Sequence, residues 1–163
     1  AARVAECLVR ARDVSGATVP LLLENTAGAG STFGSLLEDL ALVVEACESV
    51  RAGAVALCID TCHAHVGSWP LGSAEDADAL VSRACELFGE GAIAAMHLND
   101  TPSLPGSHRD RHAWVGEGTI APAAFSQLVR DGRLAQTIGV VEAPGDVPRK
   151  DIENIERLKA MRA

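Results

Sequence analysis

Four nearly continuous apolar runs divide the chain, and each ends in acidic or imidazole side chains. The runs lie in the segments TVPLLLEN, GAVALCID, AIAAMHLND and TIGVVEAP. Strands with apolar residues on both faces are typical of a parallel sheet that is buried between two layers. The pattern therefore predicts four parallel strands, which end at Glu24, at Asp60, around His97 to Asp100, and at Glu142.

Helical segments separate these runs. The first fifteen residues have the apolar spacing of one helix face. A second helix is expected to begin near Ser35, because Ser35 and Glu38 have the spacing of a capping box. A third helix should end at Gly89, and two more are predicted in APAAFSQLVRDG and RKDIENIERLKAM. Strand and helix thus alternate four times, which predicts an α/β fold with a helix-covered parallel sheet.

The four strand ends are the first candidate site. Ligands of parallel α/β folds gather at the carboxyl ends of the strands. One acid in that place is commonly the N-cap of the next helix. Four converging side chains are different, because three neighbouring carboxylates are costly without a compensating cation. The set suits a divalent metal and consists of Glu24, Asp60, His97 and Glu142.

The stretch CIDTCHAHVGSW adds further candidate ligands. His63 follows Asp60 by three residues, so the turn can aim both at one pocket without both binding the same ion. His65 is explained at least as well as a solvated loop histidine as by a ligand role. Cys62 has no partner cysteine at zinc spacing, so it is not expected to bind a metal.

The loop HLNDTPSLPGSHRDRHAWVGEG predicts a second site. Asp110 and His112 are two residues apart, so extended backbone would place both on one side and Arg111 on the other. Together with His63 they give three protein ligands and an open position, the pattern of a catalytic zinc site. The alternative is a surface loop with solvated charges. His108 has no positional support and stays unassigned.

The glycine-rich segment TAGAGSTFG is less informative. Gly28, Gly30 and Gly34 could let backbone N–H groups approach a phosphate. A turn that requires positive φ explains them equally well, and the lysine of a phosphate-binding P-loop is absent from this segment.

Length and composition are those of one globular domain, residues 1–163. The chain has 163 residues, 48% of them hydrophobic, and no apolar run approaches the roughly 20 residues that cross a bilayer. A signal-peptide pattern is absent, which favours a cytoplasmic protein. The five cysteines form no CxxC pair and are expected to be reduced and mostly buried. The net charge of −8 would repel a polyanion, although carboxylates around bound cations are compensated.

Three segments resemble the signature segments of the endonuclease IV family of apurinic/apyrimidinic endonucleases. They are LLLENTAGAG, ALCIDTCH and MHLNDTPSLPGSHRDRH, and WVGEG and VVEAP follow in the same order. The resemblance extends from about Pro20 to the end of the chain. It implies a (β/α)8 TIM barrel with a trinuclear zinc centre that cleaves the DNA phosphodiester 5′ to an abasic site, as in base excision repair of DNA.

The resemblance also implies two ligand groups that are complete in this chain. The second metal would be held by Glu24, Asp60, His97 and Glu142, and the third by His63, Asp110 and His112. Glu24 would bridge to the first metal, and both Glu24 and Glu142 would be catalytic. Arg111 would approach the DNA backbone. Zn²⁺ is the implied cofactor, with Mn²⁺ or Mg²⁺ as alternatives.

Two features depart from the family pattern. Thr101 and Pro102 stand where the family usually has Ser-Lys, which removes a cation from a loop that would face DNA. The two histidines of the first metal would precede Ala1, so the chain would supply about four C-terminal βα units of the eight. Because half a barrel leaves open edges, we expect a longer polypeptide or a second chain to close it around the abasic-DNA site.

Two other functions compete with the nuclease. A sugar isomerase or epimerase of a xylose-isomerase-like barrel would use one divalent metal at Glu24, Asp60, His97 and Glu142. It would leave His63, Asp110 and His112 without a role. An inactive barrel remnant that serves as a binding module is the third possibility.

Overall fold

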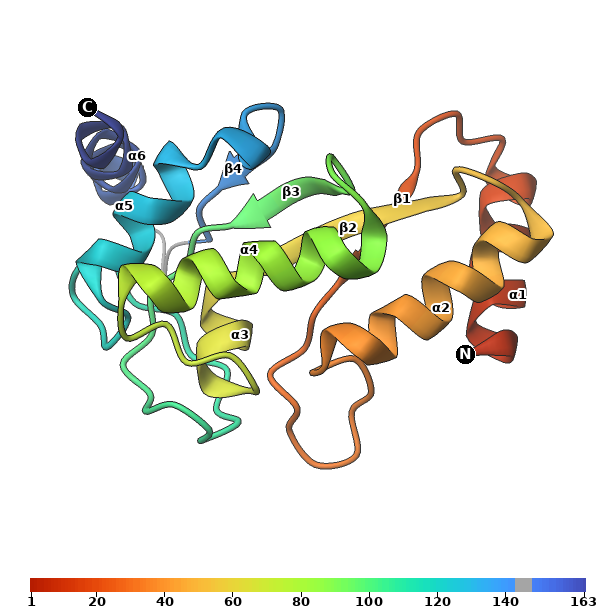
Figure 1. Cartoon of the computed structure of the whole chain (residues 1–163), viewed down its shortest axis with the longest axis horizontal. Coiled ribbons are helices and arrows are strands. Elements are labelled where there is room, and N and C mark those ends of the chain that lie inside the picture. Colours follow the sequence, from red (N-terminus) through yellow and green to blue (C-terminus); the bar gives the residue numbers. More distant parts are fainter. Residues whose placement is uncertain (143–147) are drawn as a thin grey trace.

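A computed structural model of the chain describes residues 1–142 and 148–163, and within them helices and strands alternate (Figure 1). In chain order the elements are α1 (Ala2–Ser15), β1 (Leu21–Glu24), α2 (Leu37–Val50), β2 (Val55–Asp60), α3 (Thr61–Val66), α4 (Ala74–Phe88), β3 (Ile93–His97), α5 (Pro122–Arg130), the 3-10 turn η1 (Gly132–Leu134), β4 (Ile138–Val140) and α6 (Pro148–Arg162).

The strands form one parallel sheet in the order β1-β2-β3-β4. Asp60 lies opposite His97 in the register, and His97 lies opposite Val140. Glu24 ends the shorter strand β1 opposite Cys58. All four carboxyl ends therefore meet at one edge of the sheet, and the predicted parallel α/β fold is confirmed.

The helices form a layer that follows the chain order across the sheet. Helix α1 packs on α2, α2 on α4, α4 on α5, and α5 on α6 (Figure 1). The main core lies beneath this layer, where Leu57, Ile59 and Met96 of the sheet join Leu80 and Phe125 of the helices. All five side chains are at most 3% exposed. Burial of such side chains is the main stabilising contribution to the fold.

The edge strand β4 is much less covered. Ile138 is 66% exposed and Val140 is 39% exposed, and on β1 the side chain of Leu22 is 46% exposed. Within the described residues the sheet is thus open, with free edges at β1 and β4. The pattern of apolar residues nevertheless matches strands that are built for burial on both faces.

The predicted start of α2 needs a correction. The helix begins at Leu37, and its N-cap Leu36 makes no side-chain capping bond, so the capping box of Ser35 and Glu38 is not formed. Glu38 instead accepts a hydrogen bond from Arg83 of α4 at 2.8 Å. The long-range ion pair takes the carboxylate away from the helix end. The predicted end of α4 is confirmed, because its C-cap is Gly89.

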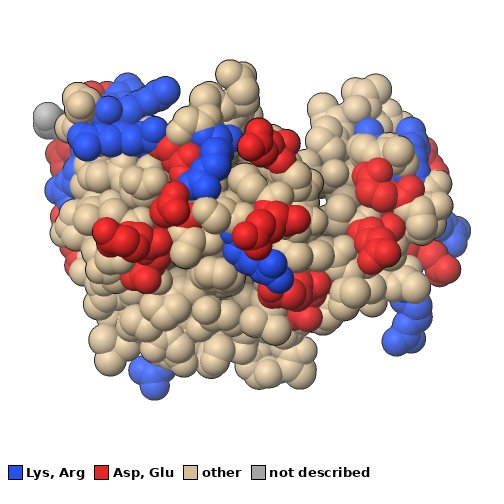
Figure 2. Space-filling model, viewed as in Figure 1, with Lys and Arg blue, Asp and Glu red and all other residues tan. Residues whose placement is uncertain are grey.

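Charges on the helix-covered face are mixed. Figure 2 shows acidic and basic side chains interspersed over this face, with no large area of one sign. All five cysteines lie in the described residues and are free thiols, as expected. None of the described helices is long and apolar enough to cross a membrane.

Candidate metal centre

Asp60 occupies the middle of the candidate centre. It ends β2 and caps α3, since its Oδ1 accepts a hydrogen bond from the backbone N–H of His63 at 2.9 Å. A carboxylate is a favourable N-cap, and the turn of helix places His63 directly above the strand end. The side chain of Asp60 is fully buried. The sequence predicted a loop after Asp60, whereas the structure has the six-residue helix α3.

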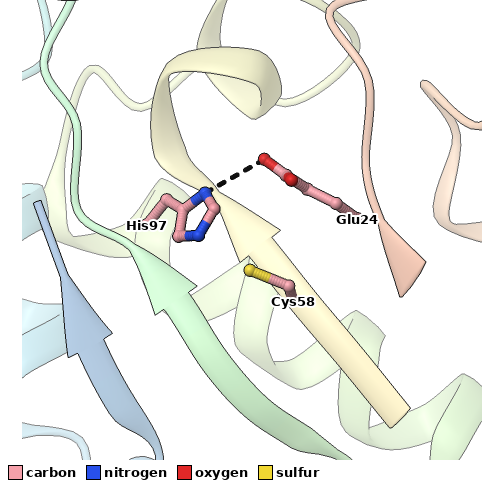
Figure 3. Close-up of side chains that lie close together, drawn as sticks. All are labelled: Glu24, Cys58 and His97. Atoms are coloured by element: carbon pink, nitrogen blue, oxygen red, sulfur yellow. Dashed lines mark hydrogen bonds and ion pairs between the residues drawn. The ribbon is translucent and has the colours of Figure 1, made fainter. Parts of the chain in front are cut away.

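One group of candidate ligands surrounds His97. Its Nδ1 lies 3.1 Å from Glu24 Oε1 and 3.3 Å from Glu142 Oε2. The same nitrogen lies 3.6 Å from Asp60 Oδ2. Figure 3 shows Glu24 and His97 pointing toward each other from the ends of β1 and β3, across β2, which lies between them and carries Cys58. The four strand-end side chains therefore converge as predicted.

A second group surrounds Asp110. Its carboxylate lies between His63 Nε2, at 3.2 Å, and His112 Nε2, at 3.3 Å. The other ring nitrogen of each histidine faces a backbone carbonyl: His63 Nδ1 is 2.9 Å from Asn25 O, and His112 Nδ1 is 3.0 Å from Glu142 O. The three side chains come from α3 and the 99–121 loop, so this predicted convergence is also present.

These bonds assign the ring protons. A carbonyl only accepts, so Nδ1 of His63 and of His112 carries the proton, and Nε2 of each neutral ring is an acceptor. Both acceptors face the acceptor oxygens of Asp110. His112 Nε2 is buried and has no hydrogen-bond partner. Such a group of acceptors is compensated either by protonation of an imidazole or by a bound cation, and histidines that ligate metals commonly donate their other N–H to a carbonyl.

The distances also fit a metal ion. Metal bonds of 2.0 to 2.2 Å place neighbouring ligand atoms of a tetrahedron about 3.4 Å apart. The contacts around His97 and Asp110 run from 3.1 to 3.6 Å. Carboxylate oxygens with imidazole nitrogens suit Zn²⁺ and other divalent ions. The residues present thus fit two adjacent divalent sites, which come close at Asp60, 3.9 Å from His112 Nε2.

The electrostatics show strong coupling between acids and histidines. A hydrogen bond with His63 lowers the pKa of Glu24. Burial disfavours the charge of Asp60, but the hydrogen bond with His97 and the nearby charge of His63 lower its pKa overall. Burial likewise opposes protonation of His63, yet the acids around it, first Glu24, raise its pKa to about 9. The hydrogen bond with Asp60 raises the pKa of His97 to about 9.

Two buried thiols lie beside the candidate ligands. Burial raises the pKa of Cys58 and of Cys62 to about 11. The thiolate is the form that binds a metal, and without a bound cation both thiols are protonated near neutral pH. The Cys62 thiol donates to Arg111 O at 3.5 Å. Cys62 nevertheless lies close to Asp60 and His112, and Cys58 close to Glu24 and His97, so the expectation that Cys62 is no ligand stays a prediction.

His65 is a buried structural residue. The sequence offered two explanations for it, a ligand or a solvated loop histidine, and the second is wrong. Its ring is 1% exposed. Nδ1 accepts from Leu71 N at 3.0 Å, and Nε2 lies 3.2 Å from Thr119 Oγ1. Both ring nitrogens are therefore used within the fold, and burial lowers the pKa of His65.

The glycine-rich segment packs against the 99–121 loop. Gly28 has φ of 76°, and a Cβ there would lie 2.9 Å from His108 Nδ1. That nitrogen lies 2.8 Å from Ala27 O. Positive φ and close packing thus explain Gly28, and His108 joins the two loops. Arg111 is exposed and donates to Asp110 O at 2.8 Å within its own loop.

Asp100 is a buried residue that sequence reasoning missed. Its Oδ1 accepts from the backbone N–H groups of Thr101 and Ile120, at 2.8 and 3.1 Å. Its Oδ2 accepts from Gly116 and Gly118, at 2.9 and 3.0 Å. One carboxylate therefore ties both ends of the loop that carries the Asp110 group. The signal in the sequence was an acid three residues beyond the end of β3, which we assigned to no role.

The substitution Asp100→Asn is expected to lower the free energy of unfolding by about 3 kcal/mol, because its amide nitrogen would face backbone donors in a buried site. Urea denaturation monitored by circular dichroism measures this. The exposed Asp151→Asn in α6 is the control and should change stability by less than about 0.5 kcal/mol. Equal midpoints for the two variants would contradict the anchoring role.

Successive parallel β/α units with helices along one face of the sheet and a candidate site at the carboxyl ends of the strands are the repeating architecture of β/α-barrel proteins. The model of the xylose isomerase-like TIM barrel family matches residues 1–161, and the chain belongs to that family. The resemblance to endonuclease IV is confirmed by the individual relatives.

Two curated relatives are both named probable endonuclease 4. The protein from Halorhodospira halophila is 39% identical over 126 residues, which are 77% of this chain and 42% of that protein. The protein from Oleidesulfovibrio alaskensis is 36% identical over 162 residues, 99% of this chain and 53% of that protein. The crystal structure of endonuclease IV from Thermus thermophilus matches with a TM-score of 0.79 and 30% identity, over 98% of this chain and 56% of that one. The chain thus spans about half the length of these relatives.

Proposed function

We propose that the chain forms part of a metal-dependent endonuclease that hydrolyses the DNA phosphodiester 5′ to abasic sites, with zinc as the metal. Similarity to proteins named endonuclease 4 supports the nuclease class. In this proposal Glu24, Asp60, His97 and Glu142 hold one metal, and His63, Asp110 and His112 hold another.

The observation that carries the proposal is the second ligand group. A sugar isomerase with one divalent metal would need only the side chains around His97. It would give no role to Asp110, whose carboxylate lies 3.2 Å from His63 Nε2 and 3.3 Å from His112 Nε2. Two adjacent cation sites are typical of enzymes that act on phosphodiesters, where charge develops on several oxygens.

Divalent cations held in these groups would supply Lewis acidity toward the phosphate and a lowered pKa for water. The protein residues divide the remaining roles. Glu24 and Glu142 are 35% and 47% exposed, so these carboxylates can accept a proton from the nucleophilic water. Asp60 is buried and fixed by its cap to α3, which suits a ligand that stays in place.

DNA would approach the same edge of the sheet. The exposed Arg111 follows Asp110 directly and is proposed to contact the phosphate backbone. The loops 25–36 and 99–121 flank the site and are joined by His108 and Ala27. Cations bound among the four acids would offset much of the local negative charge that otherwise repels DNA.

The proposal is tested on the complete protein that carries this chain. A duplex with one abasic site is incubated with the protein, the cleavage position is mapped on a denaturing gel, and metal content is measured by elemental analysis. We expect incision 5′ to the abasic site and at least two zinc ions at residues within 1–163. One tightly bound Mn²⁺ or Mg²⁺ with no cleavage of abasic DNA would contradict the nuclease and favour the isomerase.

A further inference from the structure

Asn99 is a buried residue that touches two of the candidate ligands at once. It lies two residues beyond His97, at the end of β3, and is 2% exposed. Its Nδ2 donates to Asp60 Oδ2 at 2.6 Å and to Glu142 Oε2 at 3.2 Å. Its Oδ1 accepts from the backbone N–H of Glu142 at 2.8 Å. The one amide thus bonds to a carboxylate on each side.

The position of Asn99 is itself fixed by the sheet. Thr61, the first residue of α3, donates from Oγ1 to Asn99 O at 2.7 Å and to His97 O at 3.1 Å. The backbone of Asn99 is therefore tied to the end of β2, while its side chain reaches the segment after β4. Glu142 lies outside a regular strand, since β4 ends at Val140. In the described residues, Asn99 is the side chain that bonds both the backbone and the carboxylate of Glu142.

Asn25 makes a related bridge on the other side of Asp60, but only to its backbone. Its Nδ2 donates to Asp60 O at 3.1 Å, and its Oδ1 accepts from Asp60 N at 2.7 Å. Asn25 therefore places the main chain, whereas Asn99 orients the carboxylate. Asn25 directly follows the end of β1, and it links β1 to Asp60 at the end of β2. Asn99 lies two residues beyond the end of β3, and it links Asp60 to Glu142 beyond β4.

We propose that Asn99 is a positioning residue that sets the distance between the Asp60 and Glu142 carboxylates and holds Asp60 Oδ2 and Glu142 Oε2, the two oxygens that it bonds, near His97 Nδ1. The inference rests on the proposed function, because it treats these carboxylates as metal ligands. An amide is the side chain that fits. It donates to both carboxylates and accepts from a backbone N–H, whereas an aspartate would add a third negative charge and lose both donors.

The test compares metal affinity, rather than activity, in the complete protein and its Asn99→Asp variant. Zn²⁺ affinity is measured by competition with a chromophoric chelator, and Co²⁺ absorption spectra report the ligand geometry. In Asn99→Asp we expect the group around His97 to lose 10- to 100-fold in Zn²⁺ affinity, roughly the effect of removing an outer hydrogen bond from a ligand. Its Co²⁺ spectrum should change, while the spectrum of the Asp110 group persists.

Asn154→Asp is the matched control. Asn154 is also buried, at 4% exposure, and its amide accepts from Val115 N and donates to Lys150 O, away from the ligands. It should lower stability without changing Zn²⁺ affinity. Asn99→Ala removes the donors without adding charge. If Asn99→Asp does not fold, the Zn²⁺ affinity of Asn99→Ala tests the positioning role instead. Wild-type Zn²⁺ affinity in a folded Asn99 variant would overturn the inference, whereas absent Zn²⁺ binding by the wild-type protein would overturn the proposed function.

Discussion

Replacing Glu142 by glutamine is expected to slow incision at an abasic site by about 1,000-fold, the size of effect seen when one charged or polar group is removed from a preorganised site. The carboxylate of Glu142 lies 3.3 Å from His97 Nδ1 and is 47% exposed. Glutamine has the same shape but lacks the charge that would hold a cation and accept a proton. Single-turnover cleavage of an abasic duplex measures the loss.

Stability separates this catalytic effect from misfolding. The half-exposed Glu142 contributes little burial, so without metal Glu142→Gln should melt within a few degrees of the metal-free wild-type protein. Glu90→Gln is the control, because Glu90 is exposed at the opposite end of β3 and should leave incision unchanged. Wild-type incision by Glu142→Gln would remove Glu142 from the proposed site, and a large fall in the melting temperature of the metal-free variant would attribute the loss to folding.

The strand ends could be predicted because burial on both faces leaves a local trace in the sequence. Apolar runs that end in Glu24, Asp60 and His97 became strands β1, β2 and β3 with those residues at their carboxyl ends. Parallel pairing then brings such ends together without any further information. Glu142 was reached by the same reasoning, although its strand ends two residues earlier, at Val140.

Features that depend on distant partners were harder to predict. The six-residue helix α3 is too short to show apolar periodicity, and its start is set by the cap from Asp60. Burial of His65 depends on Thr119, more than fifty residues away. The capping box failed for the same reason, since Glu38 finds its partner Arg83 in another helix. Local patterns cannot reveal such long-range bonds.

Asn25, Asn99 and Asp100 illustrate an intermediate case. Their polar side chains lie within three residues of a strand end, in the segments LEN and HLND, which is a visible signal. What they bond to is not visible in the sequence, because the partners lie on neighbouring strands or across a loop. The ligand roles, and the placement of residues 1–163 as the C-terminal half of a barrel, stay predictions.

Removing metal from the complete protein is expected to abolish incision and to lower its stability, most strongly at alkaline pH. Without metal, the acids must be compensated by protonated histidines, and the pKa values of His63 and His97 are raised to about 9. A raised histidine pKa stabilises the folded state fully below the ordinary value of about 6.5. This contribution is lost as the pH rises through 9. The metal-free protein should therefore lose stability between pH 6.5 and 9.

The metal-loaded protein should behave in the opposite way. Zn²⁺ competes with protons for the imidazoles, so its affinity rises with pH over the same range. Free metal at a thousand times its dissociation constant adds about 4 kcal/mol to the free energy of unfolding. Thermal melts with Zn²⁺ or with a chelator, taken from pH 6.5 to 9.5, should give a difference in melting temperature that widens with pH. A constant difference would show that His63 and His97 do not bind the metal through the nitrogens that are protonated in its absence.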